Sequence, residues 1–286
     1  MRRFCCVAIS LLMLFGIAVA QEKEPQTAED YANRGFARLK KGDFDGAIAD
    51  YDKAIALTPN DAAAYNRRGT ARAEKHDFNG ALADFNTAIS LKPNLYQAYF
   101  NRGQVHSNKG DYEAAINDYN IAIGLNPNYA EAYNTCGTAR SKMGNLDIAL
   151  ADYDKAIALD PNFFGAYSNR GIARNAKGDY DGAIADYDKA LALRPNYAYA
   201  YNNRGNTKGK KGDDDGAIAD FTKAISLLPN FAAAYANRGL AELDEGKEQE
   251  AEQDFNKALE ISPSLKSFIE KETNKIKQKR NTAPKP

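Results

Sequence analysis

The sequence predicts an all-α fold, a solenoid of stacked helix pairs, because a unit of 34 residues occurs seven times between 28 and 265. Every unit has Gly at its eighth place, Ala at its twentieth and Pro at its thirty-second, without an insertion or deletion. Periods of about 20–50 residues are typical of solenoids, in which each unit buries its apolar face against its neighbours. The predicted units are 28–61, 62–95, 96–129, 130–163, 164–197, 198–231 and 232–265.

The first twenty residues have the pattern of a secretory signal peptide. Two arginines precede an uncharged apolar run over 4–20, which ends in Ala18-Val19-Ala20, small residues of the kind that signal peptidase recognises. We therefore expect cleavage after Ala20, a short linker over 21–27 and an exported protein, periplasmic if the source is bacterial. The alternative is a retained membrane anchor, because an apolar run of 17 residues is at the lower limit for spanning a bilayer.

Each unit is predicted to form two antiparallel helices joined by a tight turn. In the first unit, the first helix is expected over 28–41, and Gly42 follows where a helix end favours positive φ. The side chain of Asp43 can cap the second helix, and Pro59 ends it. The small residues at the eighth and twentieth places let the two backbones approach, and aromatic residues at the fourth and twenty-fourth places fill the space around them.

The last residues, 266–286, leave the repeat pattern and are expected to form a capping helix with a basic tail. Leu265, Phe268, Ile269 and Ile276 fall on one helical face, which fits a helix that covers the last repeat. The segment has seven basic and two acidic residues. The alternative to a solvated cap is contact of this tail with anionic lipid at a membrane surface or with a cell-wall polymer.

The repeats over 28–265 resemble those of the tetratricopeptide repeat (TPR) family. The Gly, Ala, aromatic and Pro positions fall at that family's spacing in all seven units, with Tyr in place of the family's usual Trp at the fourth place. The resemblance implies a right-handed superhelix in which the first helices line a concave groove. Seven units would make close to one full turn.

Arginine stands at the seventh place of the repeats, where the family usually has an apolar residue. Six units have it, and Cys136 is the exception: Arg34, Arg68, Arg102, Arg170, Arg204 and Arg238. All units have aspartate at the twenty-third place: Asp50, Asp84, Asp118, Asp152, Asp186, Asp220 and Asp254. We interpret these residues as a repeated structural ion pair, the alternative being an array of arginines that binds an anionic ligand. Because Asp152 lacks an arginine at the seventh place of its unit, repeat four is expected to be the weakest.

No motif in the sequence indicates catalysis, a metal site or a cofactor. His76 and His106 have no Cys or Glu at metal-ligand spacing, and His76 takes a turn place that is Gly in the other six units. A net charge of zero, from 38 basic and 38 acidic residues, argues against a dedicated nucleic-acid binder. We therefore expect a non-enzymatic protein with no cofactor, no metal and no nucleic-acid partner.

The candidate binding site is the groove whose lining the resemblance identifies. The two-lysine carboxylate clamp of one branch of the family is absent, because no Lys stands at the second or fifth place. Asparagine recurs instead at the sixth place, where some long superhelical members hold the main chain of an extended peptide. An amide offers a donor and an acceptor to a peptide unit, and the alternative is that it caps local backbone. The candidate residues are Asn33, Asn101, Asn169, Asn203 and Asn237 at the sixth place, Asn66, Asn134 and Asn202 at the fifth, and Gln104 and Asn206 at the ninth.

The function that these patterns favour is an exported scaffold that binds an extended peptide segment of another protein in its groove. One alternative is a cell-envelope assembly subunit that associates with copies of itself. A second alternative is an auxiliary module for a separate enzyme.

Overall fold

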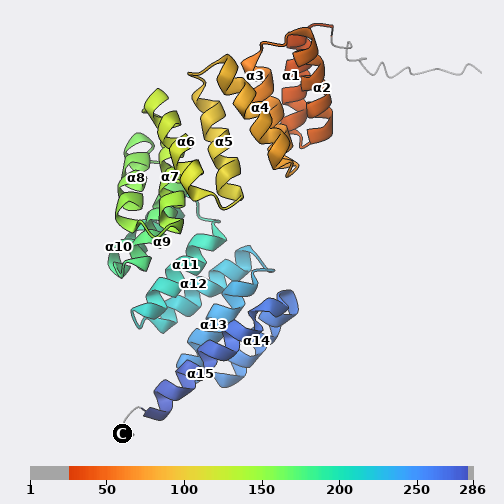
Figure 1. Ribbon diagram of the computed structural model, residues 1–286. Helices are drawn as coiled ribbons and strands as arrows, with labels where there is room; N and C mark the ends of the chain where they lie inside the picture. The colour runs from red at the N-terminus through yellow and green to blue at the C-terminus, as the bar shows by residue number, and fades with distance from the viewer. Residues whose placement is uncertain (1–25, 283–286) are drawn as a thin grey trace, which may run out of the picture.

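The computed structural model describes residues 26–282, all of whose regular structure is helical. The predicted signal peptide and most of the predicted linker lie outside these residues. Within them the helices form seven consecutive pairs and a final single helix (Figure 1). The helices are α1 (Ala28–Lys40), α2 (Phe44–Leu57), α3 (Ala62–Glu74), α4 (Phe78–Leu91), α5 (Tyr96–Asn108), α6 (Tyr112–Leu125), α7 (Ala130–Lys142), α8 (Leu146–Leu159), α9 (Phe164–Ala176), α10 (Tyr180–Leu193), α11 (Ala198–Lys210), α12 (Asp214–Leu227), α13 (Ala232–Asp244), α14 (Glu248–Ile261), the short 3-10 helix η1 (Pro263–Leu265) and α15 (Lys266–Thr282).

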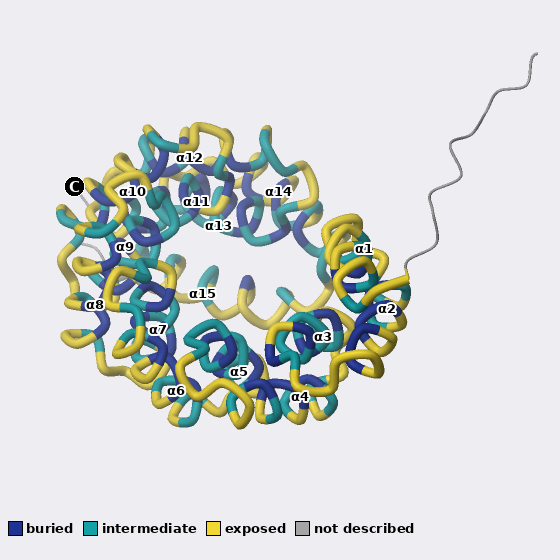
Figure 2. Tube along the Cα trace, turned by 90° about the horizontal axis from the view of Figure 1, so that it is seen from above, coloured by how far each residue is buried: buried dark blue, intermediate teal, exposed yellow. Residues whose placement is uncertain are grey.

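The pairs stack into a superhelix, which confirms the predicted all-α solenoid. Each odd-numbered helix from α3 to α13 packs against the second helix of its own pair and against the second helix of the preceding pair. Seen from above, the first helices of the pairs, α1 to α13, lie on the inner side of a ring and the second helices, α2 to α14, on its outer side (Figure 2). The inner, concave surface is therefore built mainly from the first helix of each repeat.

The close approach of the two helices in a pair depends on the glycine at the eighth place. A Cβ atom at Gly35 would lie 3.1 Å from Cε1 of Tyr51 and 3.3 Å from the backbone oxygen of Ala47. The Tyr51 ring and Ala47 are both fully buried. A side chain at this place would therefore crowd the Tyr51 ring and the Ala47 backbone.

The turns between paired helices have the predicted left-handed residue. Gly42 has a φ of 78°, and His76 adopts a φ of 62° at the equivalent place of the second unit. The first helix ends one residue earlier than predicted, at Lys40, because Lys41 is its C-cap. Asp43 caps the second helix as expected, its carboxylate accepting a hydrogen bond of 3.0 Å from the backbone nitrogen of Gly46.

The final helix, α15, caps the solenoid at its C-terminal end. Ile269 is buried against Ala236 of α13 and Ala258 of α14. Arg280 donates hydrogen bonds to the last carbonyl groups of α13, those of Leu243 and Asp244. The prediction of a capping helix is confirmed, but Phe268 does not share its buried face and is 42% exposed. No helix among residues 26–282 is long and apolar enough to span a membrane.

Candidate functional site

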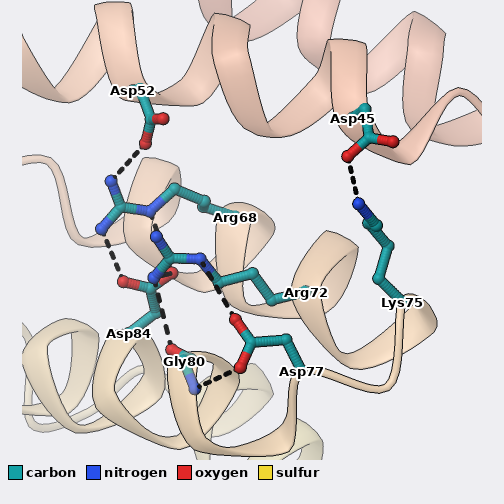
Figure 3. Close-up of polar contacts among 8 residues, drawn as sticks. All are labelled: Asp45, Asp52, Arg68, Arg72, Lys75, Asp77, Gly80 and Asp84. Atoms are coloured by element: carbon teal, nitrogen blue, oxygen red, sulfur yellow. Dashed lines mark hydrogen bonds and ion pairs between the residues drawn. The ribbon is translucent and has the colours of Figure 1, made fainter.

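The arginine and aspartate that recur at fixed places of the repeats make a polar contact that joins three helices. In the second repeat, Nε and Nη2 of Arg68 on α3 donate hydrogen bonds of 2.9 and 2.6 Å to the two carboxylate oxygens of Asp84 on α4 (Figure 3). The remaining Nη1 donates a hydrogen bond of 2.6 Å to Asp52, on α2 of the preceding repeat. One guanidinium thus links the two helices of its own repeat to the repeat before it.

The same arrangement recurs along the solenoid, which confirms the structural interpretation of the arginines. The seventh-place arginines of repeats three, five, six and seven also bond the aspartate of their own repeat and a polar residue of the preceding one: Arg102 to Asp118 and Asn86, Arg170 to Asp186 and Asp154, Arg204 to Asp220 and Asp188, and Arg238 to Asp254 and Thr222. The hydrogen bond with Asp220 raises the pKa of Arg204 above its ordinary value. These guanidinium groups are already paired with carboxylates and do not form an anion-binding array.

A second cation reaches most of the buried aspartates from the eleventh place. In the second repeat, Nη1 of Arg72 lies 2.8 Å from Oδ2 of Asp84 (Figure 3). Arg174 and Lys208 contact Asp186 and Asp220 in the same way, each at 2.9 Å. A buried carboxylate is stable only when its charge is paired, and here two cations share that role.

In repeat four, Asp152 has a cationic partner although its unit has Cys136 at the seventh place. Arg140, at the eleventh place, forms an ion pair with Asp152 through Nη1. Its Nη2 donates a hydrogen bond of 3.0 Å to Oδ1 of Asn120, the residue equivalent to Asp52. Arg140 therefore makes both links that the seventh-place arginine makes in the other repeats. Burial nevertheless raises the pKa of Asp152 above its usual range, because only one cation opposes the cost of desolvation.

The concave surface contains an open cavity of about 480 Å³ that spans repeats two to five. Four of the ten predicted residues line it together: Asn101, Gln104, Asn134 and Asn169. Thr70 and Thr138, at the ninth place of their units, also line it, and the rings of Phe85 and Tyr119 contribute apolar walls. Among the described residues, Glu74 is the one acidic residue of the lining, and His76 also lines the cavity. The other lining groups are neutral amides, hydroxyls and apolar side chains.

The sixth-place amides connect neighbouring repeats, an arrangement that the sequence analysis did not predict. Nδ2 of Asn101 donates to Oδ1 of Asn66, at 3.1 Å, and to the Thr70 hydroxyl, at 3.3 Å. Asn169 repeats both bonds two repeats later, with Asn134 at 3.0 Å and Thr138 at 3.4 Å. Asn237 donates to Asn202 at 2.9 Å. The fifth-place asparagines are therefore acceptors within the scaffold.

These amide bonds leave groups available on the groove side. No hydrogen bond within 26–282 uses Oδ1 of Asn101 or Asn169, so each side chain keeps an amide oxygen as an acceptor, whereas both Nδ2 hydrogens have acceptors in the preceding repeat. The alternative that these amides cap local backbone is wrong for Asn101 and Asn169, because their partners are side chains of the preceding repeat. The signal in the sequence was the alternation of asparagine at the fifth place, in repeats two, four and six only.

The remaining candidate residues lie away from the central cavity. Asn206 and Asn237 line a separate cavity of about 310 Å³ with Glu272 and Ile276 of α15. Asn33 is exposed on α1. Half-buried Asn203 accepts a long hydrogen bond of 3.5 Å from Asn202. The structure thus divides the predicted site into a central group, a C-terminal group and Asn33 alone in the first repeat.

The described residues hold no cluster of three or more His, Cys, Asp or Glu side chains that could bind a metal. Nδ1 of His106 lies 3.6 Å from a carboxylate oxygen of Asp111, and His76 occupies a turn. Burial raises the pKa of the Cys136 thiol to about 12, so the thiol is protonated at neutral pH. Its thiolate, which is the nucleophilic form, is correspondingly disfavoured.

Comparison with protein families identifies the same repeat along the chain. A tetratricopeptide repeat model matches 96–129, 130–163, 198–231 and 232–265. A TPR repeat model matches 35–75, 69–110 and 173–212, and a further tetratricopeptide repeat model matches 152–185. Together the matches extend from 35 to 265. No curated protein matches the sequence.

Solved structures share the fold. The structure of MamA is 32% identical over 58% of this chain and 96% of that chain, with a TM-score of 0.52. A tetratricopeptide repeat protein from Parabacteroides merdae is 23% identical over 87% of this chain and 99% of that chain, with a TM-score of 0.68. YrrB, described as a TPR protein with an unusual peptide-binding site, is 24% identical over 64% of this chain and 95% of that chain, with a TM-score of 0.53.

Proposed function

The chain belongs to the tetratricopeptide repeat family, and on that basis we propose that it is an exported, non-enzymatic scaffold that binds an extended peptide segment of a partner protein in its concave groove. The observation that supports this proposal is the amide array of the central cavity. Asn101 and Asn169 come from repeats three and five, and each directs one amide hydrogen-bonding group away from the scaffold contacts that fix its side chain.

The fixed position of these amides favours peptide binding. Because Nδ2 of each asparagine is bonded to the preceding repeat, the side chain pays little conformational entropy when a ligand binds. The Oδ1 atom of each amide can accept a hydrogen bond from a peptide N–H, which is a contact with the main chain only. The lining, which is neutral apart from Glu74, therefore suits a partner that is recognised mainly through its backbone.

The proposal includes export and the absence of catalysis. Export is motivated by the predicted signal peptide, and the absence of catalysis by the sequence, which has no nucleophile, phosphate-binding or metal motif. The fold of YrrB, whose description includes a peptide-binding site, is shared by this chain. That likeness supports the location of the groove and does not identify a ligand.

The proposal can be tested with a library of random 12-residue peptides selected against the immobilised protein. Selected peptides are then titrated against Asn101→Ala and against Asn66→Ala. Both substitutions break the same hydrogen bond between Asn101 and Asn66, but only the first removes an amide from the cavity. A lost hydrogen bond of about 0.5–1.5 kcal/mol corresponds to an affinity about two- to tenfold lower.

We expect Asn101→Ala to show this loss and Asn66→Ala to bind nearly as well as the parent chain. Circular dichroism and the melting temperature check that both variants fold alike. If the parent chain selects no peptides, or if the two variants and the parent bind with equal affinity, the central cavity is not the binding site.

A further inference from the structure

At the N-terminal end of the groove, two cations lie over one aromatic ring. Of the residues that the structure describes, no lysine or arginine belongs to the lining of the central cavity. Phe36 of α1 is 40% exposed. Nζ of Lys40 lies 4.5 Å from the centroid of its ring, and Cζ of Arg67 on α3 lies 5.3 Å from the same centroid. Such cation–π contacts at exposed sites are individually weak.

The repeat register places these three side chains on the concave surface. Phe36, Lys40 and Arg67 stand at the ninth, thirteenth and sixth places of their units. Residues at these same places line the central cavity: Thr70 and Gln104 at the ninth, Glu74 and Asn108 at the thirteenth, Asn101 and Asn169 at the sixth. The aromatic ring and its two cations therefore extend the groove toward the first repeat.

Neither cation has a carboxylate partner in the described part of the chain. Within 26–282, no ion pair involves Lys40 or Arg67, although Glu74 stands on the same helix as Arg67. The seventh-place arginines contrast with this, because each of them contacts a buried aspartate. Two like charges beside one ring repel each other, and an anion bound between them would relieve that repulsion.

A buried donor next to this group also lacks a partner. The hydroxyl of Tyr51 is buried and makes no hydrogen bond to any residue that the structure describes. The equivalent hydroxyl of Tyr153 contacts Thr138 at 3.3 Å, and the equivalent Tyr119 lines the central cavity. Burial raises the pKa of Tyr51 to about 12, and the charge of nearby Arg67 acts in the opposite direction. An unpaired buried donor is costly, and Arg67, which has only donors, leaves the Tyr51 hydrogen without an acceptor.

We propose that Lys40, Arg67 and Phe36 form a site for a carboxylate of the partner peptide, at the N-terminal end of the groove. The inference rests on the proposed function, because the carboxylate belongs to the peptide that the central asparagines bind. The planar guanidinium of Arg67 can donate two parallel hydrogen bonds to a carboxylate, Lys40 adds a second charge, and the Phe36 ring packs against the aliphatic part of the residue that bears it. The carboxylate can be an Asp or Glu side chain or the peptide C-terminus.

The experiment uses two random 12-residue peptide libraries, one fused at its C-terminus and one with free C-termini. Both are selected against the parent chain, Lys40→Gln, Arg67→Asn and Arg194→Asn. Arg67→Asn introduces the residue found at the sixth place of five other repeats, so the fold should tolerate it. Arg194→Asn is the matched control, because Arg194 also lies over an aromatic ring, 4.7 Å from the centroid of Phe164, in the loop after α10.

The parent chain and Arg194→Asn are expected to enrich acidic peptides, whereas Lys40→Gln and Arg67→Asn are not. Enrichment in the fused library identifies an Asp or Glu side chain, and enrichment only among free C-termini identifies the terminal carboxylate. Individual acidic peptides should bind each of the two variants about two- to fivefold more weakly, as expected for one exposed ion pair. Peptides without an acidic excess, or equal enrichment by Arg67→Asn, would overturn the inference.

A second measurement separates this site from the proposed function. The Nε–H NMR signal of Arg67 is followed while glutarate, a small dicarboxylate, is added to the full chain. A saturable shift in the parent chain that is weaker in Lys40→Gln supports the site even if no peptide is selected. An unchanged Arg67 signal overturns the site, whatever the central asparagines bind.

Discussion

At the scale of single residues, Cys136 shows how a departure from the repeat is accommodated. It replaces the seventh-place arginine and is fully buried. Its sulfur atom lies 3.8 Å from Oδ1 of Asn120. Because its side chain is uncharged, repeat four lacks the cation that the other repeats have at the seventh place. Arg140 compensates by contacting both Asp152 and Asn120.

The buried thiol predicts a specific dependence of stability on pH. The thiol pKa is about 12 in the folded chain and about 8.5 in an unfolded one. The stabilisation is complete below the unfolded pKa and is lost as the pH rises toward the folded pKa. Between pH 7 and pH 10, the free energy of unfolding should therefore fall by about 2 kcal/mol more in the parent chain than in Cys136→Ala. Urea unfolding at both pH values measures this difference.

Because Cys5, Cys6 and the other titrating groups are common to both chains, their contributions cancel in that comparison. Parallel pH profiles for the parent and Cys136→Ala would show that the thiol ionises equally in the folded and unfolded states.

At the scale of helices, the arginine contact replaces part of the apolar packing expected between neighbouring repeats. The guanidinium of Arg170 on α9 bonds buried Asp186 on α10 and exposed Asp154 on α8. A single side chain therefore fixes the position of one helix against two others. Its two carboxylate partners differ sharply in exposure, with side chains that are 4% and 59% exposed.

This difference in exposure predicts unequal costs of removal. Asp186→Ala leaves Arg170 and Arg174 beside an empty buried position, and breaking a buried pair costs about 3–5 kcal/mol. Asp154→Ala removes an exposed pair, which contributes at most about 1 kcal/mol. Urea unfolding of both variants, followed by circular dichroism, gives the two free energies. Similar small losses for the two substitutions would mean that the Asp186 contact adds nothing to stability.

At the scale of the whole molecule, the seven pairs surround a central opening, and α15 lies at its C-terminal end (Figure 2). The groove changes character along this path. It begins with the cations beside Phe36, continues with neutral amides through repeats two to five, and ends in the cavity that Asn206 and Asn237 share with α15. A peptide that follows the groove would meet these surfaces in order.

Export is the prediction that concerns the whole chain. The Ala18-Val19-Ala20 sequence should direct cleavage after Ala20, so the mature protein is expected to begin at Gln21, with or without cyclisation of that residue. Mass spectrometry of the protein from the exported fraction of its host measures the N-terminus. A chain in that fraction that still begins at Met1 would favour the retained anchor.

The sequence by itself determined the fold and the Arg–Asp pairs within the repeats. The glycine of the eighth place and the alanine of the twentieth recur because the paired backbones approach within contact distance, so a period of 34 residues specifies each helix pair. The Arg–Asp pairs were predictable for the same reason, since residues at fixed places in equivalent units have equivalent neighbours.

The tertiary structure alone decided which repeats share a contact and which groups remain available. The substitution of Arg140 for the missing arginine depends on one long side chain, a turn further along α7, that reaches both Asp152 and Asn120. The bonds from Asn101 to Asn66 and Thr70 join residues 35 and 31 positions apart. The convergence of Lys40 and Arg67 on Phe36 likewise joins two repeats. Such contacts depend on how far each side chain extends across the interface between repeats, and the spacing of residues along the chain does not specify that distance.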